Sequence, residues 1–256
     1  ANLNFENELA KIQEDFPDDI IWAPKFLTQT LKTKGDPYEL GRYEDEWGCV
    51  FHNKQKGIIG EVKEPLVKSW QDIDKLKTPY ELLSIDKNKI NEFCLSTDKF
   101  VIGAPAPRPF ERLQFIRGTD VLFMDLVEYG ADLCALIERL HKFYLQEFEL
   151  WAQTDVDGLF FMDDWGSQNS LLISPAMWRK IFKPLYKDYV YVAHKYNKYA
   201  FMHSDGNISE ILSDLIEIGL DAVNSQIFCM GSEELGKKHC GKITFWGEID
   251  RQSILP

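Results

Sequence analysis

The chain has 256 residues, of which 45% are apolar, and its formal net charge is −12 at pH 7. This length and apolar content predict one large packed domain, and the acidity disfavours nucleic acid or an anionic membrane surface as a partner. No apolar run approaches the roughly 20 residues that span a bilayer, and residues 1–20 carry no signal-peptide pattern.

The five cysteines are widely spaced and include no C-x-x-C pair. An odd number without close pairs is typical of free thiols in a reducing compartment, and it argues against a closed four-cysteine zinc site. We therefore expect a cytoplasmic protein.

The N-terminal part predicts a short amphipathic helix over residues 3–15 and a strand over 19–23, with Lys25 directly after the strand. Residues 43–51 and 58–62 read as two strands that pair across 53–57. We expect this hairpin to form an insertion on the rim of the domain, at about residues 43–65. Short helices are expected at 70–76 and 85–95.

A buried strand is predicted over residues 99–103, followed by a loop stiffened by three prolines that carries Arg108. Helices then follow at 110–117, 121–128 and 132–154.

The second half of the chain repeats a strand and helix unit. Strands are predicted at 158–162, 198–203, 221–225 and 242–246, and all but the last precede a helix. Ser174 and Pro175 predict the start of a helix of about 20 residues, and Asn207 and Ser232 are expected to cap the next two helices.

Alternating strands and helices predict an α/β protein with a parallel sheet, and this many units in residues 1–256 favours one TIM (β/α)₈ barrel domain. The number of predicted strand and helix units is below eight, and no helix is predicted after the last strand. We expect the C-terminal part of the barrel to lie beyond residue 256.

Polar side chains follow each predicted strand, where a parallel barrel places its functional groups. His203 and Asp205 share one face of a strand end and could bind a metal together. Alternation sends only one of Asp163 and Asp164 into the barrel mouth and leaves the other to a turn or helix cap. Asp163, Asp164 and Glu248 are the candidates for catalysis. The candidates for substrate binding are Lys25, Arg108, Trp165, Asn224, Gln226 and Asp250.

For several candidates a structural role competes with the functional one. A lone histidine is as often hydrogen-bonded to a neighbour within the core as it is a metal ligand. Glu248 and Asp250 could lie on a solvated rim instead of acting as a catalytic acid or base. Cys229 and Cys240 are candidate thiolate ligands of the metal, but a buried free cysteine is the commoner state.

Seven blocks in order resemble the uroporphyrinogen decarboxylase superfamily, which includes corrinoid-linked methyltransferases. These blocks are Asp45–Gly48, Pro109–Arg112 with Arg117 and Gly118, Asp163–Trp165, Ile173–Pro175, His203–Asn207, Asp214–Gly219 with Asp221, and Thr244–Asp250. The resemblance implies a TIM barrel and a small-molecule substrate, with a homodimer as a further expectation.

The resemblance is closer to the methyltransferase branch, because the arginine-rich motif of true uroporphyrinogen decarboxylases is replaced by a single lysine, Lys25. In that branch a His-x-Cys with a distant second cysteine binds zinc. Here His203 matches the histidine, but Asp205 stands at the cysteine position. A metal held by oxygen ligands would polarise a substrate oxygen better than it would activate a substrate thiol. This favours transfer of a methyl group from a methoxy substrate to a corrinoid protein.

The sequence thus leads to three hypotheses. The first is a methyltransferase that moves a methyl group between a small methoxy substrate and a corrinoid protein or a thiol. In this hypothesis His203 and Asp205 bind either a metal, for which zinc is a candidate, or a substrate oxygen. The second is a decarboxylase acting on a porphyrinogen or a smaller acid, and the third is a non-catalytic binding protein that keeps the barrel.

Overall fold

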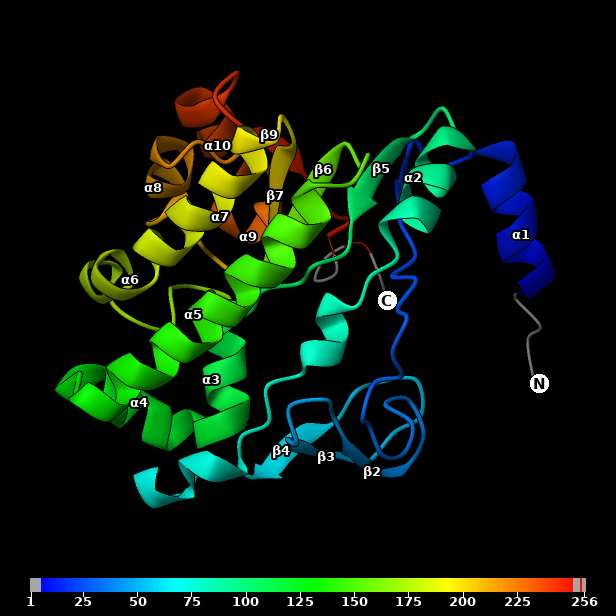
Figure 1. The fold of residues 1–256 in the computed structure, drawn as a ribbon. Helices are drawn as coiled ribbons and strands as arrows, with labels where there is room; N and C mark the ends of the chain where they lie inside the picture. Colours follow the sequence, from blue (N-terminus) through cyan, green and yellow to red (C-terminus); the bar gives the residue numbers. More distant parts are fainter. Residues whose placement is uncertain (1–5, 251–253, 255–256) are drawn as a thin grey trace.

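Six short strands form a curled parallel sheet in the computed structural model, which describes residues 6–250 and residue 254 (Figure 1). Their order across the sheet equals their order along the chain. They are β1 (Ile20–Trp22), β5 (Phe100–Gly103), β6 (Gly158–Met162), β7 (Tyr199–Ser204), β8 (Ala222–Ser225) and β9 (Thr244–Trp246). Sequential parallel strands are the arrangement of a (β/α)₈ barrel, so the predicted α/β class is confirmed, as a partial TIM barrel.

Helices connect successive strands and cover the outer face of this sheet. The described helices are α1 (Glu6–Asp15), α2 (Lys87–Leu95), α3 (Pro109–Arg117), α4 (Thr119–Glu128), α5 (Ala131–Ala152), α6 (Pro175–Ile181), α7 (Lys183–Lys195), α8 (Leu212–Glu217), α9 (Ile227–Met230) and α10 (Ser232–His239). Two 3₁₀ turns, η1 (Trp70–Lys75) and η2 (Tyr80–Leu83), lie between the first strands and α2.

Strand burial follows the alternation expected from the sequence. Ala200 and Met202 of β7 are fully buried against the helix layer, whereas Phe201 and His203 lie on the opposite face and are partly exposed. Behind the sheet, the Phe161 ring of β6 stacks on Tyr186 of α7 with 5.3 Å between ring centroids. Aromatic side chains therefore join the sheet to α5 and α7 and give the barrel wall a rigid outer layer.

The length of the helix that begins after Ser174 and the cap of the helix at Ser232 differ from the prediction. The helix opened by Ser174 is confirmed, with its hydroxyl accepting the Met177 N–H, but it divides at Phe182 into α6 and α7. Pro184 has no N–H to donate to a preceding turn, which accounts for the division. Ser232 is the first residue of α10, and Gly231 occupies the cap position.

Asn207 does not cap a helix. α8 begins only at Leu212, and the Asn207 Oδ1 instead accepts hydrogen bonds from the N–H and hydroxyl of Ser209. Such local side-chain bonds compete with helix formation.

The predicted hairpin is a three-stranded antiparallel sheet, which we call the rim sheet. β2 (Gly41–Glu44) pairs with β3 (Val50–Asn53), and β3 pairs with β4 (Glu61–Glu64). The prediction missed the turn over residues 45–48, which divides the first expected strand in two. Figure 1 shows the rim sheet apart from the parallel sheet and next to α3.

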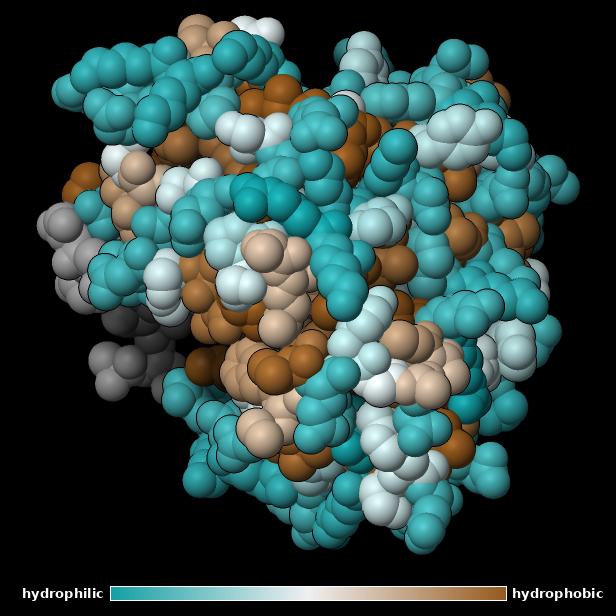
Figure 2. Space-filling model, turned by 90° about the vertical axis from the view of Figure 1, so that its left-hand side faces the viewer, coloured by the Kyte–Doolittle hydropathy of each residue, from teal (hydrophilic) through white to brown (hydrophobic). Residues whose placement is uncertain are grey.

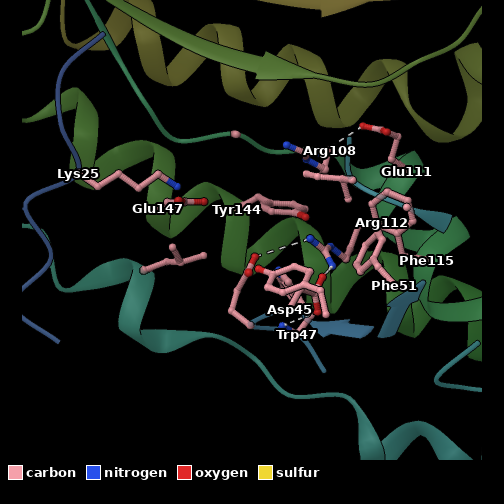
Figure 3. A pocket seen from close by; sticks show the side chains of 16 residues that line it. Lys25, Asp45, Trp47, Phe51, Arg108, Glu111, Arg112, Phe115, Tyr144 and Glu147 are labelled. Atoms are coloured by element: carbon pink, nitrogen blue, oxygen red, sulfur yellow. Dashed lines mark hydrogen bonds and ion pairs between the residues drawn. The ribbon is translucent and has the colours of Figure 1, made fainter. Parts of the chain in front are cut away.

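A buried ion pair joins the rim sheet to α3. The Asp45 carboxylate pairs with the Arg112 guanidinium and also accepts the N–H groups of Trp47 and Cys49 at 3.1 Å and 2.7 Å (Figure 3). The guanidinium lies 5.2 Å from the Trp47 ring centroid and 5.4 Å from that of Phe115. Both terminal nitrogens of Arg112 therefore pair with acidic residues of the turn that follows β2 and join this segment to α3.

No helix in the described part of the chain has the length and apolar character required to cross a membrane. Figure 2 views the side on which α4 and α6 lie in Figure 1, and hydrophobic residues there alternate with hydrophilic ones.

We expect Asp45→Ala to lower the free energy of unfolding by about 3–5 kcal/mol, because it leaves the Arg112 charge buried without its partner. Urea denaturation measures the loss, and hydrogen exchange should become faster in β2–β4 first. Glu233→Ala, at an exposed position of α10, serves as the control. Equal unfolding curves for Asp45→Ala and the wild type would contradict this role.

Candidate functional site

Four strands align at their carboxyl ends and place side chains in one row. The register pairs Met162 of β6 with His203 of β7, His203 with Asn224 of β8, and Asn224 with Trp246 of β9. Adjacent positions in register point to the same face of the sheet. The middle of the row is therefore polar and faces the barrel mouth.

Asn224 fixes the orientation of the His203 ring. The amide Nδ2 of Asn224 donates to the Trp246 carbonyl at 3.0 Å, so its Oδ1 faces His203 Nδ1, 2.6 Å away. Because an amide oxygen only accepts, Nδ1 carries the proton and donates it. With the proton on Nδ1, the nitrogen that can bind a metal is Nε2, as in metal-ligating histidines whose other nitrogen donates a hydrogen bond.

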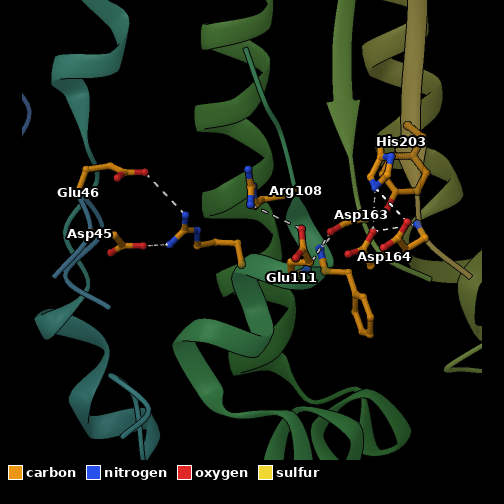
Figure 4. Close-up of polar contacts among 11 residues, drawn as sticks. Asp45, Glu46, Arg108, Glu111, Asp163, Asp164 and His203 are labelled. Carbon is orange, nitrogen blue, oxygen red and sulfur yellow. Dashed lines mark hydrogen bonds and ion pairs between the residues drawn. The ribbon is translucent and has the colours of Figure 1, made fainter. Parts of the chain in front are cut away.

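Two carboxylates lie beside this nitrogen (Figure 4). Oδ1 of Asp164 is 3.5 Å from His203 Nε2, and Oδ1 of Asp205 is 3.6 Å from it. One atom from each of the three side chains lies within 4.8 Å of the others, and we call Asp164, His203 and Asp205 the His203 cluster. Donors at about 2.0–2.2 Å from a zinc ion are roughly 3–3.5 Å apart, so a small contraction would let these atoms share a cation.

Close backbone contact brings the two acidic residues together. Gly206 has a φ of 77°, and a Cβ added there would lie 2.1 Å from the Gly166 carbonyl oxygen. The loops after β6 and β7 meet at this point, and the Asp205 N–H donates to Asp164 Oδ1 at 2.9 Å. Glycine is required because both the conformation and the contact exclude a side chain.

Asp163, predicted as a catalytic candidate, is fully buried behind the mouth. Its carboxylate accepts the N–H groups of Phe110 and Glu111 at 2.9 Å and 2.8 Å and the Tyr186 hydroxyl at 2.6 Å. Burial, and then the charge of Glu111, raise the pKa of Asp163, while the three donors oppose the shift. Asp163 therefore caps α3, and Asp164 is the member of the pair that reaches the mouth.

Trp165 is also fully buried, which corrects its predicted role in lining a substrate pocket. Its ring stacks on Phe110 with 4.1 Å between centroids, and its Nε1 donates to the Tyr186 hydroxyl at 2.8 Å. That bond directs the Tyr186 proton toward Asp163. Trp165 thus belongs to the packing that supports the site.

Three of the remaining candidates, Asn224, Gln226 and Glu248, line a pocket of about 360 Å³. Two members of the His203 cluster, His203 and Asp205, line the same pocket. Gln226 also accepts the Gly206 N–H at 3.2 Å, which supports the Asp205 loop. Asp250 follows Glu248 and is not among the residues that line this pocket. Their roles in substrate binding or catalysis stay predictions.

Lys25 and Arg108 line a second cavity of about 430 Å³, which we call the rim pocket (Figure 3). It lies between the rim sheet, α3, α5 and the loops that follow β1 and β5. Two acidic residues that the sequence analysis did not select, Glu111 and Glu147, also line it. Glu147 interrupts the apolar stripe of α5, between the buried Tyr144 and Phe148. A charged residue in such a stripe could have identified Glu147 as a candidate site residue from the sequence.

Glu111 connects the rim pocket with the His203 cluster. Its Oε2 is buried, accepts no hydrogen bond and lies 3.8 Å from an Arg108 nitrogen. Burial raises the pKa of Glu111, with the Asp164 charge acting in the same direction and Arg108 and His203 against it. Figure 4 shows the Glu111 carboxyl between Arg108 and the pair Asp163 and Asp164.

Polar side chains gathered at the carboxyl ends of a curled parallel sheet occupy the position of the functional face of a TIM barrel. The family model described as Uroporphyrinogen decarboxylase (URO-D) matches residues 45–255, so the chain belongs to the URO-D family. A search of curated proteins found no match.

Among solved structures, the chain is similar to a methyltransferase from Methanosarcina mazei, with a TM-score of 0.60 and 14% sequence identity. The alignment covers 92% of this chain and 66% of the other, so the chain spans just under two thirds of that protein. At this identity the similarity shows a shared fold, in agreement with the barrel geometry described above.

We expect Asp163→Ala to lower the free energy of unfolding by about 3 kcal/mol or more, since three buried donors lose their acceptor. Thermal or urea unfolding measures the change. Asp163→Asn removes fewer contacts and should fall between Asp163→Ala and the wild type. If Asp163→Ala unfolds like the wild type, Asp163 does not cap α3 in the way its contacts indicate.

Proposed function

We propose that this member of the URO-D family is a methyltransferase that moves a methyl group from a small methoxy substrate to a corrinoid protein. The observation that carries the proposal is the His203 cluster, in which one imidazole nitrogen and two carboxylate oxygens converge at the strand ends. The structural similarity to a methyltransferase supports it at the level of fold.

The donor set fits a divalent metal such as zinc. A nitrogen and two oxygens, without a thiolate, form a harder site than one built on cysteine, and Asn224 holds the ring in the tautomer that leaves Nε2 available. Asp164, His203 and Asp205 would hold the ion. A bound metal would polarise the ether oxygen of the substrate as a Lewis acid.

The side chains around the His203 cluster supply the rest of the chemistry. In methyl transfer the methyl–oxygen bond would break, the methyl group would pass as a cation to the reduced corrinoid of the partner protein, and the oxygen, which keeps the bonding electrons, would take up a proton. Glu111 suits this task, because its raised pKa favours the protonated carboxyl and its Oε2 carries no other hydrogen bond. Glu248, which lines the adjoining pocket, is positioned to orient the substrate.

A decarboxylase is the second candidate, and Lys25 with Arg108 is the observation that favours it, because both cations line one pocket and would attract an acid. A non-catalytic barrel is less well supported. In such a protein His203 would be satisfied by backbone groups alone, whereas here it bonds to the Asn224 side chain and lies beside two carboxylates.

The metal part of the proposal predicts that the wild-type protein binds one Zn²⁺ and that His203→Ala abolishes this binding. Asn224→Ala should weaken it by about 10–100-fold, because only the support of the ring is lost. Equilibrium dialysis with metal analysis gives both values, and His194→Ala on α7 is the matched control. Negligible zinc in the wild type and in His203→Ala alike would reject the metal site.

The reaction predicts that the protein, a reduced corrinoid protein and a methoxy compound together yield the demethylated product. Asp164→Asn should lower kcat/KM by about 100-fold or more, since one ligand charge disappears while the shape is kept. Product analysis by chromatography separates the outcomes. Release of carbon dioxide without methyl transfer would favour the decarboxylase.

A further inference from the structure

The rim pocket joins apolar walls to charged groups in one cavity. Tyr43 and Phe51 of the rim sheet, Phe115 of α3 and Tyr144 of α5 contribute rings to its lining. Its volume of about 430 Å³ falls in the range of small-molecule sites. Such walls suit a ligand with a flat, apolar body.

Two cations in this pocket lack the partners that buried charges require. Lys25 is half-buried and makes no hydrogen bond or ion pair with the described residues. Arg108 is 31% exposed at its side chain, and the one ion pair that this side chain forms with the described residues is the 3.8 Å approach to Glu111. Arg112, by contrast, pairs with Asp45 and Glu46. Lys25 and Arg108 thus keep their donors available for a ligand.

Apart from the 3.8 Å approach of Glu111 to Arg108, the acidic side chains that line the pocket form no ion pair with these two cations. Asp45 and Glu46 face Arg112. The Glu147 carboxyl points toward Lys25 (Figure 3), and burial raises its pKa to about 7, with Lys25 and Arg108 opposing the shift and Glu46 adding to it. A protonated Glu147 leaves the Lys25 charge uncompensated.

We propose that the rim pocket binds a small organic acid with a flat apolar body, whose carboxylate is held by Lys25 and Arg108 while its ring packs against Tyr43 and Phe51. The planar guanidinium of Arg108 matches a carboxylate with two parallel hydrogen bonds. If the proposed methyl transfer also holds, on which this last step rests, the substrate class is a methoxybenzoate-like acid. Its methoxy group would point past Glu111 toward the His203 cluster.

Benzoate is the probe for this inference, with binding measured by isothermal titration calorimetry on the full-length protein. Lys25→Met and Arg108→Gln should each weaken benzoate binding by about tenfold or more, because each removes a charged donor. Lys187→Met, at an exposed position of α7, should bind like the wild type. Benzamide has the same ring without the charge and should bind at least about tenfold more weakly than benzoate.

The ring and the charge are tested separately. Acetate carries the carboxylate without the ring and should bind more weakly than benzoate. Thermal unfolding of each variant checks that it is folded. Absence of benzoate binding to the wild type, or unchanged affinity in folded Lys25→Met and Arg108→Gln, would overturn the inference.

The pH dependence supplies an independent readout. As the pH rises through about 7, Glu147 loses its proton, competes for Lys25 and repels the ligand. Benzoate affinity should then fall by up to about tenfold for each pH unit. Glu147→Gln keeps the neutral form and should flatten this dependence, and a slope equal to that of the wild type would contradict the role of Glu147.

These experiments distinguish failure of the proposed binding from failure of the proposed methyl transfer. Benzoate binding without any methyl transfer from methoxybenzoate would reject the methyltransferase and retain the pocket. Methyl transfer from a neutral methoxy compound, with no benzoate binding, would reject the acid-binding role of the pocket and retain the methyltransferase.

Discussion

The hydrogen bonds of the buried Asp163 carboxylate join three parts of the barrel wall. Asp163 follows β6, accepts the first N–H groups of α3 and is bonded by Tyr186 of α7. Its neighbour along the chain, Asp164, faces the mouth. One carboxylate thus fixes the start of α3, which carries Glu111, and by its burial fixes the direction in which Asp164 points.

This arrangement brings two chemically different sites together. The His203 cluster offers a nitrogen and two oxygens that suit a metal, whereas the rim pocket offers cations and rings that suit an organic acid. Glu111 lies between them, buried and without a hydrogen bond at Oε2. A substrate that spans both sites would expose its reactive group to the cluster and keep its charge at the rim.

Much of the fold could be predicted because its signals are local. Apolar runs ended by glycine or polar residues mark the parallel strands, and β6 begins and ends where its sequence indicates. The prediction that a helix begins at Asn207 was wrong. The Asn207 side chain bonds to Ser209 instead, and the preceding residue, Gly206, is held in contact with Gly166. The bond to Ser209 is local and competes with the hydrogen bonds of a helix, whereas the contact between Gly166 and Gly206 joins two loops that are distant in the chain.

The sequence by itself determined the strand order, the carboxyl-end position of His203 and Asp205, and the expectation that only one of Asp163 and Asp164 would face the mouth. Only the tertiary structure decided that Asp164 is that residue, that Asn224 orients His203, and that Trp165 is buried. It also brought Lys25, Arg108 and Glu147 into one pocket. Alternation along a strand is a property of neighbouring residues, whereas these contacts depend on how separate elements pack.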